Sequence, residues 1–234
     1  EDDCSCDALE LTPSQYNFVN SDKRFIYYNG GRGSGKSWAC ALKLATMIED
    51  GTILDGARIA IFGPTYPQLK KGCILTFDKL LGEAGLIIEK VDGNEPERRL
   101  VRDIVAYFRN ASTPDPTRAH EVQVVWLDEA AQMDESVLTL TNASLRQFGN
   151  DARYQTLISS TPRGRNWLWR SFVNPDTRRY SDDKIDYFQT STIEAYEYGI
   201  VRDDYIEELG YEPGSEMWKQ EVLAEFVTWS GLVR

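Results

Sequence analysis

The chain has 234 residues, of which 41% are apolar and 27% are charged. This composition is that of a globular protein long enough to bury a core, and it excludes collagen-like, low-complexity and disordered chains. The formal net charge is −11, which excludes a protein coated in basic charge. No apolar run approaches the roughly 20 residues needed to span a bilayer, and no signal peptide is visible, so we expect no membrane association.

Histidine and cysteine usage limits the kinds of metal or redox site. His120 is the only histidine, so a metal cluster built on histidines is excluded. The four cysteines fit neither a zinc ribbon nor a C-x-x-C redox motif, and we expect them to be reduced in a cytosolic protein. Residues 1–10 carry five acids and no base, which predicts an acidic N-terminal tail. Because the chain starts with Glu1 rather than Met, we expect that some preceding sequence has been removed.

Short β-rich runs alternate with helical stretches, which predicts one α/β domain over residues 11–234. The expected strands are Arg24–Asn29, Arg58–Phe62, Ile104–Phe108, Val122–Leu127, Thr156–Ser160 and Ile185–Gln189. The expected helices are Pro13–Asn20, Lys36–Glu49, Pro67–Gly82, Glu135–Phe148, Arg165–Val173, Asp203–Leu209 and Ser215–Ala224. Residues 59–62 and 124–127 are unbroken apolar runs, as in strands buried on both faces, so we expect a mainly parallel sheet flanked by helices.

A glycine-rich run carries the strongest functional signal. It is Gly30-Gly31-Arg32-Gly33-Ser34-Gly35-Lys36-Ser37, which satisfies the Walker A pattern G-x-x-x-x-G-K-[ST]. An apolar strand precedes it and a helical stretch follows, so backbone N–H groups and a helix N-terminus would face phosphate oxygens. We expect the run to bind ATP, with Lys36 on the β- and γ-phosphates and Ser37 on Mg²⁺. The alternative is a glycine-rich turn before an ordinary helix.

A second signal is a hydrophobic strand, residues 124–127, that ends in two acids. A carboxylate at the end of such a strand can hold Mg²⁺ directly or through water, which is the role expected of Asp128. The adjacent Glu129 is then placed to orient and deprotonate a water that attacks the γ-phosphate. This pair favours hydrolysis over phosphoryl transfer to a small acceptor. Without the glycine-rich run, the two acids would simply begin a loop.

Three further elements have competing interpretations. Ser160 and Thr161 end another predicted strand, where they can sense the γ-phosphate or serve as turn residues. Gln15 can recognise the adenine edge through its amide, or complete a capping box with Thr12. Arg118 and Arg32 are candidates to stabilise transition-state charge as arginine fingers, whereas an arginine taken at random is a surface residue.

Together these motifs resemble the ATPase domain of the large terminase subunit of tailed bacteriophages. The resemblance rests on the Gln15 helix, GGRGSGKS, VVWLDEAAQ, LISSTPRG and the segment Met217–Leu232, in this order from about Leu11 to the chain end. It implies a P-loop NTPase (ASCE/RecA-like) fold and ATP hydrolysis that pumps double-stranded viral DNA into a procapsid. Lys36 and Ser37 then bind phosphate and Mg²⁺, Asp128 belongs to the Mg²⁺ site and Glu129 is the catalytic glutamate. Ser160 and Thr161 fall in the coupling motif, and Gln15 falls in the adenine-recognition element.

The resemblance also implies partners and a location. Such proteins form a ring, usually of five subunits, on the portal protein, together with a small terminase subunit. We expect the isolated chain to be monomeric, and the working motor to dock transiently on the procapsid in the host cytoplasm. In some relatives an arginine finger acting across subunits lies about ten residues before the acidic pair, as Arg118 does, whereas in others the P-loop arginine, here Arg32, acts within the subunit. The family's nuclease domain is absent from residues 1–234, so we expect no nuclease activity.

Two alternatives stay open. Another RecA-like nucleic-acid translocase or helicase would need a second such domain, for which 234 residues leave no room. A non-catalytic ATP-binding assembly module would retain ATP unhydrolysed, and the Asp128–Glu129 pair argues against it. The stretch 146–180 is rich in arginine, and its members are candidates either for DNA contact or for ordinary surface charge.

Overall fold

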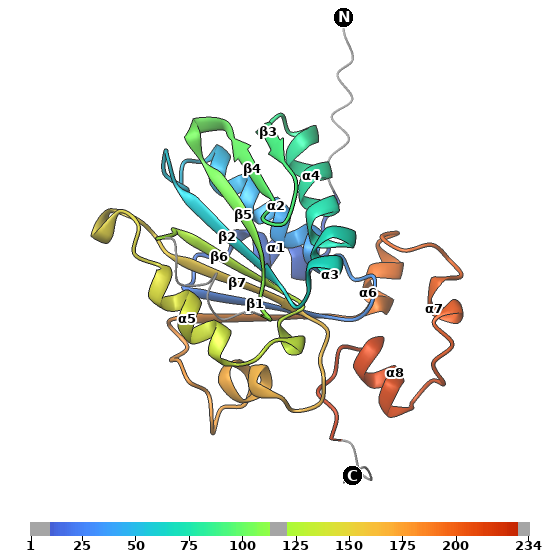
Figure 1. Cartoon of the computed structure of the whole chain (residues 1–234). Helices are drawn as coiled ribbons and strands as arrows, with labels where there is room; N and C mark the ends of the chain where they lie inside the picture. The colour runs from blue at the N-terminus through green and yellow to red at the C-terminus, as the bar shows by residue number, and fades with distance from the viewer. Residues whose placement is uncertain (1–9, 113–120, 229–234) are drawn as a thin grey trace, which may run out of the picture.

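The computed structural model describes residues 10–112 and 121–228. Its centre is an eight-stranded sheet with the order β3-β4-β5-β2-β6-β7-β1-β8 (Figure 1). The parallel strands are β1 (Phe25–Gly30), β2 (Arg58–Gly63), β5 (Val105–Asn110), β6 (Val124–Asp128), β7 (Gln155–Ser160) and β8 (Ile185–Thr190). The predicted parallel sheet and its strand positions are therefore confirmed to within about two residues.

An antiparallel edge was not predicted. It consists of β3 (Ile87–Val91) and β4 (Glu97–Leu100), which pair with each other and then with β5. These strands are short and largely polar, so no apolar run marks them in the sequence. Tertiary contacts stabilise them: Arg98 of β4 is 2% exposed, and its guanidinium bonds both carboxylate oxygens of Asp78 at 2.6 and 3.0 Å.

Helices cover both faces of the sheet. One face packs against α1 (Pro13–Asn20), α2 (Lys36–Glu49), α3 (Tyr66–Lys71) and α4 (Cys73–Glu83). The other face packs against α5 (Ser136–Ser144) and the segment 167–173, where a π-helical turn replaces most of the helix predicted for 165–173. The single helix predicted for 67–82 is split at Gly72, which ends α3 and begins α4.

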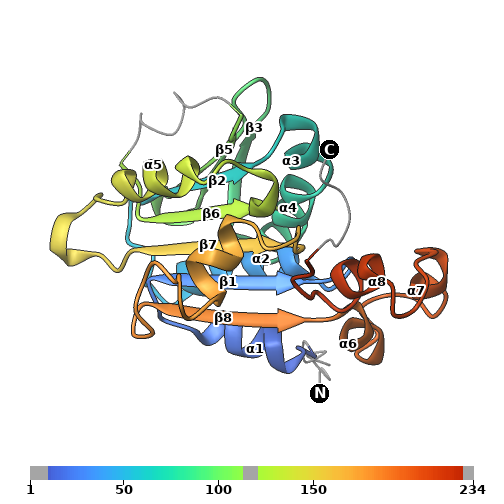
Figure 2. The ribbon, with the colours of Figure 1, turned by 90° about the horizontal axis from the view of Figure 1, so that it is seen from below.

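Three short helices form a lobe beyond the carboxyl ends of β1 and β8 (Figures 1 and 2). They are α6 (Thr192–Glu197), which was not predicted, α7 (Tyr205–Glu208) and α8 (Glu216–Glu221), the last two shorter than expected. Throughout residues 10–112 and 121–228, no helix has the length and apolar character that a membrane crossing requires.

Strand order decides which loops meet. β7 lies between β1 and β6, with Asn29 of β1 opposite Ser160 and Asp128 of β6 opposite Ser159. Because carboxyl ends of parallel strands share one edge of a sheet, the loops after β1, β6 and β7 converge there. All three predicted motifs lie on these loops.

Candidate functional site

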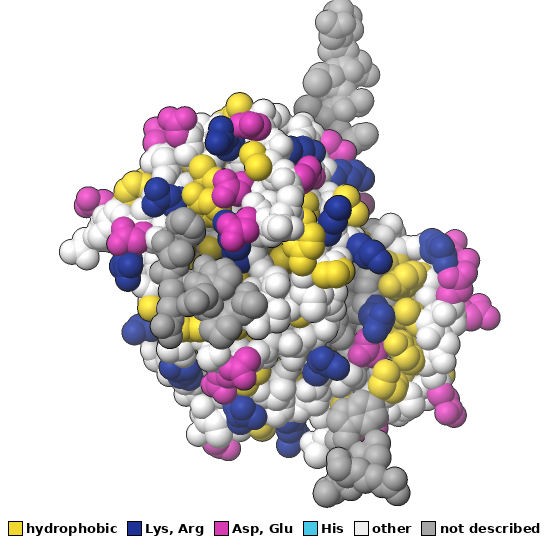
Figure 3. All heavy atoms as spheres, viewed as in Figure 1, with side chains coloured by type: hydrophobic (Ala, Val, Ile, Leu, Met, Phe, Trp, Pro, Cys, Tyr) yellow, Lys and Arg dark blue, Asp and Glu magenta, His cyan; other side chains and the backbone are white. Residues whose placement is uncertain are grey.

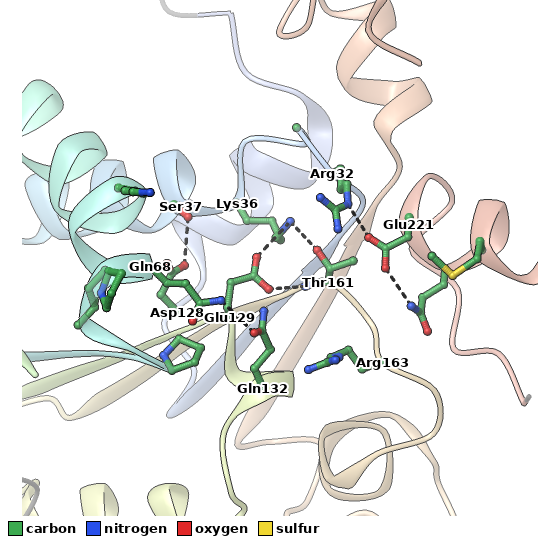
Figure 4. A pocket seen from close by; sticks show the side chains of 18 of the residues that line it. Arg32, Lys36, Ser37, Gln68, Asp128, Glu129, Gln132, Thr161, Arg163 and Glu221 are labelled. Atoms are coloured by element: carbon green, nitrogen blue, oxygen red, sulfur yellow. Dashed lines mark hydrogen bonds and ion pairs between the residues drawn. The ribbon is translucent and has the colours of Figure 1, made fainter. Parts of the chain in front are cut away.

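The glycine-rich loop, residues 30–37, connects β1 to α2 (Figure 4). Gly33 and Gly35 have φ angles of 72° and 75°, in the left-handed region where a side chain would be strained. Lys36 Nζ donates to the carbonyl oxygens of Gly30 at 3.2 Å and Gly31 at 3.0 Å, and to Thr161 Oγ1 at 3.1 Å. An ammonium group, backbone amides and the N-terminus of α2 thus surround one point, which is the chemistry of an anion site.

Asp128 is buried at the end of β6 and accepts two hydroxyl hydrogen bonds on Oδ1. Ser37 donates at 3.0 Å and Ser159 donates at 2.7 Å, while Ser159 itself accepts from the Trp126 indole at 2.9 Å. Burial, and then the nearby charge of Glu129, raises the pKa of Asp128 to about 6. A cation beside this carboxylate would favour its ionised form.

Ser37 and Asp128 offer the hard oxygen donors that Mg²⁺ prefers. In the described part of the chain, no group of three or more His, Cys, Asp or Glu side chains could hold a metal ion. A cation at this pair would therefore take its remaining ligands from water and phosphate oxygens, as Mg²⁺ commonly does with nucleotides. The residues fit the predicted magnesium site in their chemistry.

Glu129 has the backbone conformation of a strained residue. Its φ of 52° and ψ of 43° lie in the left-handed region, which a non-glycine residue seldom adopts. This turn aims the carboxylate into the cavity, where Oε1 lies 3.9 Å from Lys36 Nζ and Oε2 accepts the Thr161 backbone N–H at 3.4 Å. The side chain is 31% exposed, so water can reach it. An accessible carboxylate in this place can accept a proton.

The two coupling candidates face in different directions. Thr161 contacts Lys36 through its hydroxyl and Glu129 through its backbone. The buried Ser160 hydroxyl instead accepts from the Ala131 N–H at 2.9 Å and donates to the Thr161 carbonyl at 3.0 Å. Ser160 therefore fastens the loop after β6 to the end of β7, and Thr161 is the member that faces the cavity.

Arg32 joins the glycine-rich loop to the lobe. Its Nε donates to Glu221 Oε2 at 2.7 Å, and its backbone N–H donates to the Glu221 carbonyl at 2.8 Å. The Thr192 hydroxyl donates to the Arg32 carbonyl at 2.7 Å. The Arg32 side chain is 55% exposed whereas that of Glu221 is 10% exposed, so the carboxylate is the buried partner.

Gln15 forms the predicted capping box. Its backbone N–H donates to Thr12 Oγ1, and the Thr12 N–H donates to Gln15 Oε1, both at 3.1 Å. The capping interpretation is confirmed. The other end of the same amide lies against Gly35, since a Cβ built there would be 2.6 Å from Gln15 Nε2. Adenine recognition by Gln15 stays a prediction.

These residues line one cavity of about 1180 Å³. Those predicted from sequence that line it are Arg32, Gly33, Lys36, Ser37, Asp128, Glu129 and Thr161. Gln68, Gln132, Arg163, Gln220 and Glu221 also line it and were not predicted as part of this site. Glu221 lies 189 residues from Arg32, so no local pattern could have identified it. Arg118, the other predicted finger, lies outside the described residues.

Most arginines of the stretch 146–180 have local partners. Arg146, Arg170 and Arg178 pair with Glu121, Glu135 and Asp182. Arg165 and Arg179 lie over the rings of Trp169 and Tyr180. Figure 3 shows Lys and Arg side chains scattered among acidic ones on the face in view. The surface-charge interpretation accounts for these residues, and Arg163 alone among them lines the cavity.

Comparison with known sequences decides the family. Residues 27–233 match the family described as "Terminase large subunit, T4likevirus-type, N-terminal". The chain belongs to the large terminase family. Its predicted resemblance is therefore confirmed, although a comparison with curated proteins gives no significant match.

Solved structures show the same fold. The large terminase of a thermophilic bacteriophage, in complex with ADP, matches 93% of this family member with a TM-score of 0.73 and 15% identity. The ATPase domain of the Thermus phage P74-26 large terminase matches 93% with a TM-score of 0.63 and 23% identity. The N-terminal domain of the bacteriophage phi29 DNA packaging ATPase matches 77% with a TM-score of 0.52 and 15% identity.

The coverage of these relatives differs. The match includes 94% of the P74-26 ATPase domain and 96% of the phi29 domain, but only 54% of the large terminase solved with ADP. This terminase-family chain thus spans about half the length of that ADP-bound relative. The predicted P-loop NTPase fold is confirmed.

Proposed function

We propose that this chain hydrolyses ATP and, as the motor domain of a phage large terminase, drives translocation of double-stranded DNA into a procapsid. The observation that carries the proposal is the convergence of Lys36, Asp128 and Glu129 in one cavity, from three strand ends that the chain order separates. Relatives of the same fold have been solved with ADP and with ATP-γ-S, which supports a nucleotide as the ligand.

Each side chain has a role in this proposal. The backbone amides of residues 30–37 cradle the phosphates, and Lys36 neutralises charge on the β- and γ-phosphates. Ser37, together with water bonded to Asp128, would hold Mg²⁺, which supplies charge neutralisation of the phosphates. Gln15 lies beside Gly35, where its amide is placed to read the adenine.

Hydrolysis requires a base and an activated water. Glu129 accepts a proton from water as the water oxygen bonds to the γ-phosphorus and the bond to the β,γ-bridging oxygen breaks. Thr161 contacts both Lys36 and Glu129, so it can report the loss of the γ-phosphate to the segment after β7. Ser160 ties that segment to the turn carrying Glu129. This pair is our candidate for coupling chemistry to movement.

ATP turnover tests the catalytic half of the proposal. We expect turnover by the chain with Mg²⁺, and none above background by Glu129→Ala, because the variant lacks the proton acceptor. Retention of bound ATP without turnover by the unaltered chain would contradict the proposal and favour the non-catalytic module. Turnover that persists in Glu129→Ala would remove Glu129 from its role.

The arginine finger is tested by mixing variants. A specific rate that rises with protein concentration would mean that a neighbour completes the site, with Arg118 acting across an interface. Partial recovery of turnover when Arg118→Ala is mixed with Glu129→Ala would support this arrangement. A flat rate would assign the role to Arg32, which would have to leave Glu221 to reach phosphate.

The partners follow from the family. We propose a ring, of five subunits, assembled on the portal with the small terminase subunit in the host cytoplasm. The duplex would be gripped through sequence-independent phosphate contacts, so its binding should weaken steeply with salt. ATP-dependent protection of DNA from nuclease inside procapsids, present with this chain as motor and absent with Glu129→Ala, is the measurement that checks translocation.

A further inference from the structure

Two glutamine side chains meet across the cavity on the side away from the lobe. Gln68 Nε2 donates to Gln132 Oε1 at 3.0 Å, between α3 and the turn after β6 (Figure 4). Both side chains line the cavity and both are exposed. Neither residue is needed to build the glycine-rich loop or to hold Asp128. Their place in the cavity therefore needs a chemical reason of its own.

Gln132 is tied to Glu129 by the geometry of the turn. Residues Ala130–Gln132 form a 3₁₀ turn whose N-cap is Glu129, and the Gln132 N–H donates to the Glu129 carbonyl at 3.0 Å. A 3₁₀ helix has three residues per turn, so side chains at positions i and i+3 eclipse each other. The amide of Gln132 therefore stands beside the carboxylate of Glu129, and Figure 4 shows both directed into the cavity.

The turn itself is held from both sides. The Ala131 N–H donates to Ser160 Oγ at 2.9 Å, and the Met133 carbonyl accepts from the Trp167 indole at 3.0 Å. Met133 and Trp167 are 7% and 6% exposed, so this anchor lies in the core. Hence the backbone beneath Gln132 is fixed relative to Glu129, and the direction of the amide is the remaining variable.

A chain of hydrogen bonds sets that direction. Thr65, the N-cap of α3, donates its hydroxyl to Gln68 Oε1 at 2.8 Å, which leaves Gln68 Nε2 to donate to Gln132 Oε1. With its oxygen engaged, Gln132 presents only Nε2 to the cavity. No hydrogen bond from this Nε2 is found among the described residues. The result is an oriented N–H donor next to a carboxylate acceptor.

An acceptor and a donor side by side suit one small molecule, the attacking water. A water that donates one hydrogen to Glu129 and accepts from Gln132 Nε2 has its other lone pair free for the γ-phosphorus. Side-chain amides orient attacking waters in this way in some nucleotide hydrolases. We propose that Gln132 is a further catalytic residue that holds the attacking water for Glu129, and that Gln68 is its positioning residue.

In the step itself, the water oxygen bonds to the γ-phosphorus while the bond to the bridging oxygen breaks. The proton goes to Glu129, and Gln132 exchanges none. This inference rests on the proposed ATP hydrolysis and adds to it the group that orients the nucleophile. It also means that the position of α3 affects the chemistry, because Thr65 and Gln68 belong to that element.

The test compares kcat with nucleotide affinity in the full chain. In Gln132→Ala and the near-isosteric Gln132→Met, we expect kcat to fall at least about tenfold, the low end of what a positioned catalytic group contributes. The Kd for ATP-γ-S should stay within about twofold, because the water contact is made only in the reaction. Gln68→Ala should lower kcat by about threefold or more, and the double variant should be no worse than Gln132→Ala because Gln68 acts through Gln132.

Asn150→Ala is the matched control, an exposed amide on another 3₁₀ turn (Gly149–Asp151), and its kcat should equal that of the unaltered chain. Unchanged kcat in both Gln132 variants would overturn the inference. So would a loss of ATP-γ-S affinity that accounts for the whole effect, because Gln132 would then bind the nucleotide and not the water. Failure of the proposed function is distinguishable, since the unaltered chain itself would then show no Glu129-dependent turnover.

Discussion

Gly31 can be tested as the point where the lobe rests on the glycine-rich loop. A Cβ added at Gly31 would lie 2.6 Å from the Val222 carbonyl oxygen, 2.9 Å from the Thr192 backbone nitrogen and 2.5 Å from Thr192 Oγ1. Two of these neighbours are backbone atoms, so a side-chain rotation cannot relieve the overlap. The backbone of the lobe has to move away by several tenths of an ångström in the Gly31→Ala variant.

The hydrogen bonds around the contact set the magnitude. The shift would weaken the bond from the Arg32 N–H to the Glu221 carbonyl, 2.8 Å, and that from the Thr192 hydroxyl to the Arg32 carbonyl, 2.7 Å. Overpacking costs about 1–3 kcal/mol and a lost hydrogen bond about 1 kcal/mol, so we expect the free energy of unfolding to fall by about 2–4 kcal/mol. For a chain of this size the melting temperature should drop by about 5–15 °C.

Thermal and urea unfolding, followed by circular dichroism, measure this loss. Gly82→Ala is the control, because Gly82 lies in α4 with no atom within 4 Å of its added Cβ. It should be neutral or stabilising by about 0.5–1 kcal/mol, since alanine favours a helix over glycine. If Gly31→Ala were as stable as the unaltered chain, or if Gly82→Ala lost as much, the steric reasoning would be refuted.

Three further predictions concern stability. Burial lowers the pKa of Lys43 to about 8, whereas the unfolded chain titrates near 10.5, so the unfolded chain binds the proton more tightly; unfolding free energy should therefore rise from about pH 8 to 10.5, and urea titrations should show that Lys43→Met lacks this rise. Ser159→Ala removes the partner of the Trp126 indole and a donor to Asp128, and calorimetry should show a loss of about 1–3 kcal/mol. Asp78→Ala leaves the buried Arg98 without its main partner and should cost about 3 kcal/mol in urea unfolding, whereas Asp92→Ala, at a carboxylate 77% exposed, should cost less than about 1 kcal/mol.

Local sequence was sufficient where a short segment carries its own signal. Residues 30–37 indicate an anion-binding loop, because glycine spacing and a following helix are properties of neighbouring residues. The six buried strands were predictable from their β-rich runs, which include apolar stretches. The edge strands β3 and β4 were not, because the ion pair between Arg98 and Asp78 that stabilises them joins residues 20 positions apart.

The same distinction holds within the candidate site. Sequence by itself determined that Lys36, Asp128 and Glu129 occur at strand ends, and parallel pairing then requires them to meet at one edge. It attributed Gly31 to close phosphate approach, whereas the tertiary structure gives this glycine a further reason in the backbone of Val222 and Thr192.

Only the tertiary structure decided the hydrogen bond between Gln68 and Gln132 and the ion pair between Arg32 and Glu221. Each joins elements that are distant in the chain, and either partner alone resembles any exposed polar residue. Amide and carboxylate groups acquire a specific role only through the distance and direction of their partners, which packing fixes and local propensity does not.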